Sequence, residues 1–452
     1  MRKFTHENIT EALGKGFEFY GVPPTGAMEL RVDTRETEPG DLFVGLRGGD
    51  TPEIAAKAAE KGAAACILSC GGTSLPCYRV VDTVKALQDL SAYQRARIQI
   101  PMIAVTGSCG KTTTKNMLGS ILSQLGGTLV TQGNLNNEIG LPLTLLRLGD
   151  EYSYAVVEMG MNHKGEIQAL SRLARPEAAV ITNVGSAHIE FLGSRENIAE
   201  AKAEVFRGLP PCGRAALPRD CDFYEKLRDM AKRLGLEVVP FGPGGDFEFL
   251  LKEEKGEGLF GELRTPMGSV ELRVPVIGYY NAFNVAAAAA GAFALIPDIK
   301  LETLGAGLEN FKGEKLRNEI RQGLGATFIL DCYNANPDSM RASLSMLRKM
   351  PTAGRKIALL GDMLEIGEKT EEAHRELGRF AGEFLDALFT VGENAETYLK
   401  GAREAGTACR LEACQPSETA EKLAAYVKKD DLVLFKGSRA NKLENYFFLL
   451  EK

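Results

Sequence analysis

The sequence lacks a long apolar run and an excess of basic residues. Its longest apolar run extends only from Val285 to Ile296, well short of the roughly 20 residues that a membrane helix needs. We therefore expect a buried helix there and no membrane insertion. The formal net charge of -6 argues against nucleic-acid partners, because non-specific binding to nucleic acid requires a basic face.

The cysteine pattern and the N-terminus exclude two further classes. Nine cysteines lie scattered without C-x-x-C spacing, which is typical of reduced thiols and indicates neither a disulfide framework nor a zinc site. The opening residues, MRKFTHENITEALG, contain no apolar core followed by a cleavage signal. We therefore expect no signal peptide. The sequence thus favours a cytoplasmic protein, and we expect a monomer.

The length and the apolar pattern predict several α/β domains. A chain of 452 residues exceeds what one hydrophobic core usually organises, so two or three domains are expected. Its apolar fraction of 44% and charged fraction of 25% are ordinary for a globular protein. Short apolar runs alternate with helical stretches, which is typical of α/β folds with mostly parallel sheets.

Three blocks follow from this pattern: 1–98, 99–313 and 314–452. The charged, glycine-containing stretch 312–315 is the expected linker between the last two. A helix is expected at 52–62. The expected strands are 41–46, 64–69 and 78–81 in the first block, 101–107, 154–159 and 178–183 with a β-rich stretch at 247–277 in the second, and 328–334, 356–363, 387–392 and 431–437 in the third.

The strongest local signal is the segment TGSCGKTTT, from Thr106 to Thr114. An apolar strand precedes it and a helical pattern follows. Such a loop cradles phosphates, because its backbone N–H groups point inward and the helix dipole favours negative charge. Lys111 would neutralise the β- and γ-phosphates, and Thr112 would place its hydroxyl on Mg²⁺. The other residues expected to bind the nucleotide here are Gly107, Ser108, Cys109, Gly110 and Thr113.

A stricter form of this motif would carry glycine where the chain has Val105. The segment therefore matches a shorter TGxxGKT variant. The alternative is a glycine turn followed by a polar helix start. The strand before the loop and the helix after it favour the phosphate cradle, because the motif requires both.

Three residues downstream are candidates for the metal site. Glu158 ends the strand segment YAVVEMG, where a carboxylate near the phosphate loop can hold Mg²⁺ directly or through water. His188 follows the next strand; a lone histidine is more often structural, but a place just beyond a parallel strand favours function. Lys202 lies in the helical stretch ENIAEAKAEVF and by itself would be a solvated lysine.

Longer segments occur in one order between about residues 101 and 444: TGSCGKTTT, EMGMNHKGEI, ITNVGSAHIEFLGSRENIAEAKAEVF, DCYNANPDSM, GDMLEIGE and KGSRANKLE. Together they resemble the Mur ligases. Within that family, YNANP and GDMLEIGE are similar to segments of the ligases that add D-alanyl-D-alanine to a UDP-N-acetylmuramoyl-tripeptide. The resemblance implies this ATP-dependent amide-bond formation, a step of peptidoglycan precursor synthesis, with those two molecules as substrates.

The resemblance also implies a fold of three domains. A small N-terminal α/β domain, 1–98, would bind the UDP-substrate. A central P-loop ATPase domain with a mostly parallel sheet, 99–313, would bind ATP, and a Rossmann-like C-terminal domain, 314–452, would complete the site.

The implied catalytic residues are Lys111, His188, Lys202 and Arg317. Glu158 and His188 match magnesium ligands of the family, together with Thr112, and two Mg²⁺ are implied. Lys202 matches a lysine that the family carbamylates, which would make it a further metal ligand. A lysine with a lowered pKa supplies the neutral amine that this reaction with CO₂ needs.

Further positions match nucleotide and substrate contacts of the family. Asn284, with nearby Asn281, resembles a residue that lies near the adenine. Arg317 resembles an arginine that reaches the γ-phosphate, and Asp331 resembles a ribose-binding carboxylate. The implied substrate contacts are Thr34 and Arg35, then Asn134, Asn136 and Asn137 for the UDP-muramoyl peptide, and Asn334, Asn336 and Ser438 for the dipeptide. For the last three, turn-forming asparagines and a helix cap are an equal alternative.

The chain departs from the family pattern at three places. The usual His-Asn pair after the β-rich stretch reads Tyr280-Asn281, and Pro218 stands where asparagine is frequent. A DGH-type segment that usually follows PGDLFVGLRG is absent. The shorter N-terminal domain keeps open a sister ligase with another amine or another precursor.

The implied mechanism activates the tripeptide carboxylate as an acyl phosphate, which the amine of the dipeptide then attacks. Charge neutralisation and positioning would supply most of the catalysis. A non-catalytic nucleotide-binding regulator would lack some of the phosphate-loop and metal residues, which are all present here. An NAD-binding enzyme would need a G-x-G-x-x-G segment opening a helix after a strand of the third block, and the sequence has none there.

Overall fold

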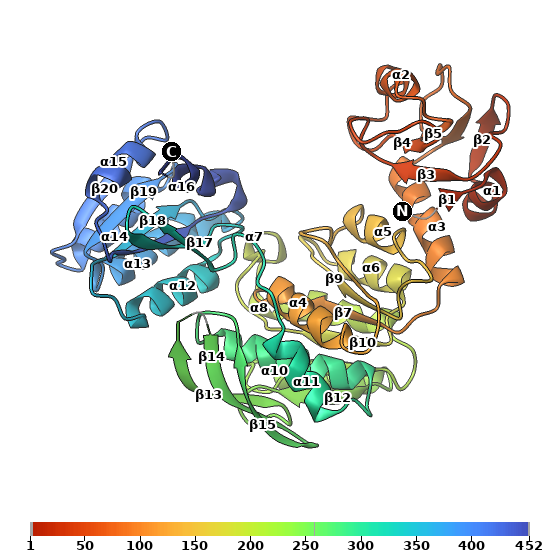
Figure 1. Cartoon of the computed structure of the whole chain (residues 1–452). Coiled ribbons are helices and arrows are strands. Elements are labelled where there is room, and N and C mark those ends of the chain that lie inside the picture. The colour runs from red at the N-terminus through yellow and green to blue at the C-terminus, as the bar shows by residue number, and fades with distance from the viewer. Residues whose placement is uncertain (1–2, 257, 451–452) are drawn as a thin grey trace.

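The computed structural model describes residues 3–256 and 258–450, which form four sheets (Figure 1). The N-terminal sheet, in red, and the C-terminal sheet, in blue, lie at opposite ends of the molecule. The central sheet and a small antiparallel sheet, in green, lie between them. Within the described ranges, no helix is long and apolar enough to cross a membrane.

The N-terminal sheet has the strand order β1-β3-β4-β5-β6-β2. Strands β3 to β6 are parallel, and the two edge strands run antiparallel to their neighbours. Helix α3 leads from this sheet into the central domain (Figure 1). The elements are β1 (Lys3–Phe4), α1 (His6–Leu13), β2 (Phe17–Tyr20), β3 (Met28–Arg31), β4 (Leu42–Val44), α2 (Pro52–Glu60), β5 (Ala65–Leu68), β6 (Cys77–Val80) and α3 (Thr83–Arg97).

The central sheet is parallel throughout, in the order β12-β11-β10-β7-β9-β8. Because its strands are parallel, their carboxyl ends meet at one edge, where α/β proteins bind ligands. The elements are β7 (Met102–Thr106), α4 (Lys111–Leu122), β8 (Thr128–Val130), α5 (Gly140–Leu145), β9 (Tyr154–Glu158), α6 (Glu166–Ala174), β10 (Ala178–Ile181), α7 (Ile189–Leu192), α8 (Arg195–Ala203), η1 (Glu204–Gly208), β11 (Arg214–Pro218), α9 (Tyr224–Arg233) and β12 (Glu237–Phe241).

An alanine-rich helix, α10, packs on one face of the central sheet beside α4. Its small side chains allow the close approach: a Cβ at Gly291 would stand 2.7 Å from Val180 Cγ2. The small antiparallel sheet precedes this helix in the chain. These elements are β13 (Glu248–Lys255), β14 (Gly258–Thr265), β15 (Gly268–Val274), α10 (Asn281–Leu295) and α11 (Leu301–Glu309).

The C-terminal sheet has the order β16-β17-β21-β18-β19-β20, and only its edge strand β16 is antiparallel among the described pairs. The elements are β16 (Glu319–Gly323), β17 (Ala326–Asp331), α12 (Pro337–Lys349), β18 (Lys356–Gly361), η2 (Gly367–Lys369), α13 (Thr370–Gly382), β19 (Ala387–Val391), α14 (Ala395–Glu404), β20 (Arg410–Cys414), α15 (Thr419–Tyr426), β21 (Leu432–Lys436), η3 (Arg439–Asn441) and α16 (Glu444–Leu450).

The predicted strands coincide with β4 to β7, β9, β10, β13 to β15, β17 to β19 and β21. The buried helix predicted from Val285 begins four positions earlier, at Asn281. The apolar pattern missed β1, β2, β3, β8, β11, β12, β16 and β20. All of these except β3 and β11 are sheet edges, where one side faces solvent and long apolar runs are not needed.

Candidate active site

The phosphate loop joins β7 to α4, and close contacts require its glycines. Gly107 has φ 152, and a Cβ there would stand 1.8 Å from Thr182 Oγ1. Gly110 has φ 76, and its Cβ would stand 2.2 Å from Asn284 Oδ1. Thr182 Oγ1 also donates to Cys109 O at 2.6 Å. The loop is therefore held between the end of β10 and the start of α10.

The phosphate loop is hydrogen-bonded to Asn183, which follows β10. The backbone N–H groups of Ser108 and Cys109 both donate to Asn183 Oδ1 at 2.9 Å. Lys111 Nζ lies over the loop and donates to Gly107 O at 2.9 Å. This is the strand–loop–helix arrangement of a phosphate cradle, with a lysine at the first turn of α4.

A buried carboxylate faces the start of α4. Glu158 is 2% exposed, and its Oε2 accepts from Thr112 Oγ1 at 2.9 Å while its Oε1 accepts from Asn136 Nδ2 at 2.7 Å. Lys115 Nζ lies 3.8 Å from Glu158 Oε2 and 3.9 Å from Glu314 Oε2. Burial lowers the pKa of Lys115. A hydroxyl and a carboxylate beside a phosphate cradle are a donor set that Mg²⁺ prefers.

Lys202 lies on α8, beneath the same loop. Its side chain is 1% exposed. Burial lowers its pKa well below the usual value, and the charge of Lys111 lowers it further. Within the described ranges, its Nζ makes no hydrogen bond and no ion pair. The position therefore holds an amine that is biased toward its neutral form.

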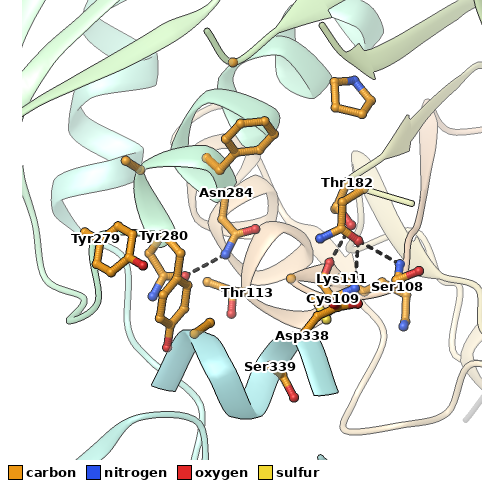
Figure 2. A pocket seen from close by; sticks show the side chains of 18 of the residues that line it. Ser108, Cys109, Lys111, Thr113, Thr182, Tyr279, Tyr280, Asn284, Asp338 and Ser339 are labelled. Atoms are coloured by element: carbon orange, nitrogen blue, oxygen red, sulfur yellow. Dashed lines mark hydrogen bonds between the residues drawn. The ribbon is translucent and has the colours of Figure 1, made fainter. Parts of the chain in front are cut away.

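A cavity of about 690 Å³ opens between the central and C-terminal domains. Figure 2 shows Tyr279 and Tyr280 at the start of α10, the phosphate loop, and the first turn of α12 with Asp338 around this space. Arg317, Asp331 and Lys436 line it from the C-terminal domain, and Asp220 lines it from the central domain. Burial raises the pKa of Asp220.

Arg317 presents an unpaired group to this cavity. Its Nε is buried and has no hydrogen-bond partner in the part of the chain that the structure describes. Its guanidinium lies over the Tyr333 ring, 4.3 Å from the centroid. The flanking residues Leu316 and Asn318 have φ values of 62 and 54, a backbone region that non-glycine residues rarely occupy.

Asp331 ends β17 in a network of hydrogen bonds. Its Oδ2 accepts from Ser343 Oγ at 2.6 Å and lies 2.8 Å from Lys436 Nζ. Lys436 Nζ also donates to Asn334 O at 2.9 Å. At the opposite wall, Asn281 and Asn284 form a chain in which Asn284 Nδ2 donates to Asn281 Oδ1 at 2.6 Å.

Side chains from the two domains meet beside the phosphate loop. Ser186 donates to Asp338 Oδ2 through its N–H at 2.8 Å and through its hydroxyl at 2.9 Å. His188 Nδ1 lies 2.8 Å from Glu365 Oε2. The adjacent His188 imidazole holds the pKa of Glu365 below its usual value, and Lys111 contributes to the same shift. The C-terminal domain is thus docked on the central domain at the nucleotide loop.

His188 and Glu158 reach different parts of the site. Glu158 is bonded to Thr112 under α4, whereas His188 lines a second cavity of about 250 Å³. Neither Glu158 nor Lys202 lines either cavity. Lys111 lines both, so the two cavities meet at the phosphate loop.

Comparisons with known proteins agree with this geometry. The Mur ligase middle domain matches residues 105–292, and the Mur ligase glutamate ligase domain matches residues 316–439. The UDP-N-acetylmuramoyl-tripeptide–D-alanyl-D-alanine ligase of Escherichia coli (strain K12) is 38% identical over 372 residues, 81% of this chain and 81% of that protein. The chain belongs to the Mur ligase family.

Solved Mur ligases share the whole architecture. A crystal structure of MurF from Acinetobacter baumannii has a TM-score of 0.90, is 35% identical and covers 99% of both chains. MurF ligase from Thermotoga maritima in complex with ADP has a TM-score of 0.80 and is 29% identical, covering 94% of this chain and 97% of that one. The α/β fold of three domains expected from the sequence is confirmed.

The predicted substrate residues of this Mur ligase are spread over the molecule. Asn136 bonds to Glu158, while Asn137 Oδ1 accepts from the N–H groups of Ile139 and Gly140. Asn134 is exposed on the same loop. Arg35 is exposed in the N-terminal domain and pairs with Asp33 at 2.5 Å, which lowers the pKa of Asp33 to about 2. Thr34, Arg35, Asn134, Asn136 and Asn137 line neither cavity.

The three residues predicted for the dipeptide have structural partners as well. Asn336 caps α12, accepting from Ser339 N at 2.9 Å, and its Nδ2 lies 3.4 Å from Cys109 Sγ. Ser438 Oγ accepts from Leu364 N at 3.1 Å, and Asn334 Oδ1 accepts from Ala335 N at 2.9 Å. All three line the smaller cavity, so cap or turn geometry and a ligand contact are compatible here.

Sequence reasoning missed several side chains of the Mur ligase site. Asn183, Asp338, Glu365 and Lys436 lie within motifs that had been recognised, but only neighbouring residues were chosen. Asn183 follows β10, as His188 does, and could have been found by the same argument from strand ends. The contact of His188 with Glu365 joins two domains, and no sequence spacing indicates it.

Proposed function

We propose that this Mur ligase adds D-alanyl-D-alanine to a UDP-N-acetylmuramoyl-tripeptide, with ATP activating the carboxylate. The cavity between the central and C-terminal domains carries this proposal. It brings the phosphate loop together with Arg317 and Asp331, which lie more than two hundred positions away in the sequence. A site built from two domains can bind ATP and assemble its cations only when the domains are closed.

The described residues fit a nucleoside triphosphate. Gly107 and Gly110 leave no space for a Cβ against Thr182 and Asn284, so the loop keeps the compact backbone course of a phosphate cradle. Lys111 supplies positive charge at the loop, and Arg317, whose buried Nε has no hydrogen-bond partner within the described residues, lines the cavity. Asp331 and the Asn281–Asn284 pair offer polar groups for the ribose and the base. We assign these residues, with Ser108, Cys109, Thr112 and Thr113, to ATP.

The donor set also fits Mg²⁺. Thr112 and Glu158, already in contact, would hold one ion, and His188 would hold a second at the other end of the loop. The ions, when bound, neutralise charge on the transferred phosphoryl group. Asn136 orients Glu158 by donating to its Oε1, which is the kind of outer contact that tunes metal affinity.

Lys202 fits a carbamate. Its amine is buried, has a lowered pKa and has no partner within residues 3–256 and 258–450. A neutral amine is the form that reacts with CO₂. ¹³C NMR of the protein in ¹³C-labelled bicarbonate should show a carbamate signal that Lys202→Arg abolishes. A spectrum identical for both proteins would refute carbamylation of Lys202.

The residues then divide the reaction into two steps. The tripeptide carboxylate attacks the γ-phosphorus, forming an acyl phosphate and releasing ADP; Lys111 and Arg317 offset the negative charge that both reactants carry. The amine of the dipeptide, having lost its proton, attacks the acyl carbon, and phosphate leaves as the amide forms. Domain contacts such as Ser186 with Asp338 hold the two domains together beside the phosphate loop.

We further propose that the domains divide at 1–98, 99–313 and 314–452. The separate sheets support these boundaries. Thr34 and Arg35 would contact the UDP-substrate from the first domain, and the loop with Asn134, Asn136 and Asn137 would contact its peptide. Asn334, Asn336 and Ser438 would contact the dipeptide.

The test is phosphate release with purified enzyme, ATP and Mg²⁺. Release should require UDP-N-acetylmuramoyl-tripeptide and D-alanyl-D-alanine together, and Lys111→Ala should abolish it. Single D-alanine or another amino acid in place of the dipeptide should give no release. Release with a single amino acid but not with the dipeptide would instead establish a sister ligase.

A further inference from the structure

The smaller cavity is formed mainly by three loops of the C-terminal domain. These follow β17, β18 and β21 and contribute Asn334, Glu365 and Arg439, among others. Ser108, Lys111 and His188 form the opposite wall. A ligand in this smaller cavity would contact the phosphate loop while leaving the larger cavity free for the nucleotide.

An acidic group on the loop after β18, Glu365, contacts the wall that carries the phosphate loop. Glu365 has φ 62, and His188, which faces it, has φ 65; such backbone strain in two opposed residues is common at functional sites. His188 engages Glu365 Oε2. For Glu365 Oε1, the described residues provide no hydrogen-bond partner, and the side chain is 43% exposed.

A basic group stands on the loop after β21. Arg439 Nη1 donates to Glu444 Oε1. Glu444 is 8% exposed whereas Arg439 is 53% exposed. The buried acid therefore fixes one end of the guanidinium, while about half of the Arg439 side chain stays exposed and the residue lines the cavity. An arginine fork held in this way suits a carboxylate.

We propose that this cavity binds D-alanyl-D-alanine as a zwitterion, with Glu365 holding its ammonium group and Arg439 holding its carboxylate. This inference rests on the proposed function and adds the two charged anchors to it. Glu365 contacts His188 and lines the same cavity as Lys111, so the amine is held at the phosphate loop, where the acyl phosphate forms. The carboxylate points away toward the loop after β21.

This orientation accounts for both charges of the substrate. The reacting end must face the phosphate loop, and Glu365 reaches across to His188 on the wall that the loop forms. Ser438, next to Arg439, and Asn334, on the loop after β17, line the same cavity and can bond the peptide group between the anchors. Lys111 and Arg439 alone would attract any anion, but Glu365 disfavours a dianion such as free phosphate.

The carboxylate anchor is tested with D-alanyl-D-alaninamide, which lacks the carboxylate. With wild-type enzyme, its KM should exceed that of the dipeptide by about 10- to 100-fold, the usual range for a lost charged hydrogen bond. With Arg439→Gln, the two KM values should become equal. Arg439→Lys keeps a positive charge beside Glu444 and should retain part of the discrimination, which guards against misfolding of the first variant.

The ammonium anchor is tested with N-propionyl-D-alanine, which replaces the ammonium group by hydrogen and cannot react. As a competitive inhibitor of wild-type enzyme, it should bind about 10- to 100-fold more weakly than the dipeptide. Glu365→Gln should remove that difference while leaving the KM for the tripeptide substrate unchanged.

Matched controls are available on the same domain. Arg410 is 49% exposed and pairs with Glu412 outside both cavities, so Arg410→Gln should keep the discrimination against the amide. Glu368 is exposed on η2, which follows the loop of Glu365, and Glu368→Gln should keep the preference for the ammonium group.

The outcomes separate this inference from the function itself. If wild-type enzyme turns over the dipeptide but Arg439→Gln and Glu365→Gln keep full discrimination, the anchors are wrong and the function stands. If wild-type enzyme releases no phosphate with the dipeptide, the proposed function fails before the anchors are examined.

Discussion

The hydroxyl of Tyr280 accepts a hydrogen bond from Asn318 Nδ2 at 2.6 Å. Tyr280 precedes α10 of the central domain, and Asn318 follows Arg317 at the start of the C-terminal domain. The bond thus joins the two domains next to the arginine assigned to the γ-phosphate. Tyr280 stands where the family usually has histidine, and burial raises the pKa of its hydroxyl, so at neutral pH it stays a neutral partner.

Tyr280→Phe should lower kcat/KM for ATP about tenfold, with the KM for D-alanyl-D-alanine unchanged. The variant keeps the ring and removes only the oxygen, so Asn318 loses a bond worth about 1 kcal/mol and Arg317 is held less firmly. Steady-state kinetics with each substrate varied in turn measures this. Tyr279→Phe, on the adjacent ring, is the control; equal effects of the two changes would rule out the positioning role.

Glu158→Gln should raise the Mg²⁺ concentration for half-maximal activity by at least about 10- to 100-fold. The amide can still accept from Thr112 but has no charge for the ion, and even outer contacts of metal sites are worth that much. Glu314→Gln is the matched control, because Glu314 also faces Lys115 but, within the described residues, makes no hydrogen bond with Thr112. A Mg²⁺ requirement equal to wild type in Glu158→Gln would exclude Glu158 as a ligand.

Lys202→Met should abolish turnover and stabilise the protein by about 1–3 kcal/mol in bicarbonate-free buffer. Folding removes the proton from a buried lysine, and the apolar side chain avoids that cost. Because the folded pKa lies below the unfolded value of 10.5, wild-type stability should rise as pH rises toward 10.5, whereas the variant should not share that rise. Denaturant unfolding at several pH values measures both effects.

The free energy of unfolding should fall in mild acid because of the buried side chain of His374. It is fully buried, and burial lowers its pKa below 6.5. Its Nε2 accepts from Met363 N at 3.0 Å, on the loop that carries Glu365, so this nitrogen must be unprotonated. The folded state binds fewer protons than the unfolded state between the two pKa values. Stability is therefore complete above 6.5 and falls below it, by at most about 1.4 kcal/mol per pH unit.

Thermal unfolding of wild type and His374→Gln between pH 7.5 and 5 at roughly half-unit steps tests this. The variant should be less stable at neutral pH, because Met363 loses its partner, yet its stability should depend less on pH. Parallel curves for the two proteins would show that another group is responsible.

Local motifs carried most of the sequence prediction. The strand, the glycine loop and the helix around Lys111 are contiguous, so spacing alone indicated them, and the structure has all three. The assignment of β4 to β7 and of the strands of the third block also held, because buried parallel strands are apolar along their whole length. Edge strands such as β8 and β16 were not predicted, because the side of such a strand that faces solvent interrupts the apolar run.

The roles of His188 and Lys202 illustrate where such reasoning stops. The pattern placed His188 beyond a strand end but could not reveal Glu365 opposite it. The helical stretch around Lys202 predicts a solvated lysine there, yet the structure buries this side chain. Burial depends on what packs over a segment, and the segments packed there are distant in the sequence.

By itself, the sequence determined the α/β class, the phosphate loop and the resemblance to the Mur ligases, because each depends on residues close together in the chain. Only the tertiary structure decided which distant groups meet: Arg317 at the nucleotide cavity, Tyr280 at Asn318, and Glu365 and Arg439 around one small cavity. Contacts between domains arise from packing of whole sheets and helices, and one-dimensional spacing carries no measure of that packing.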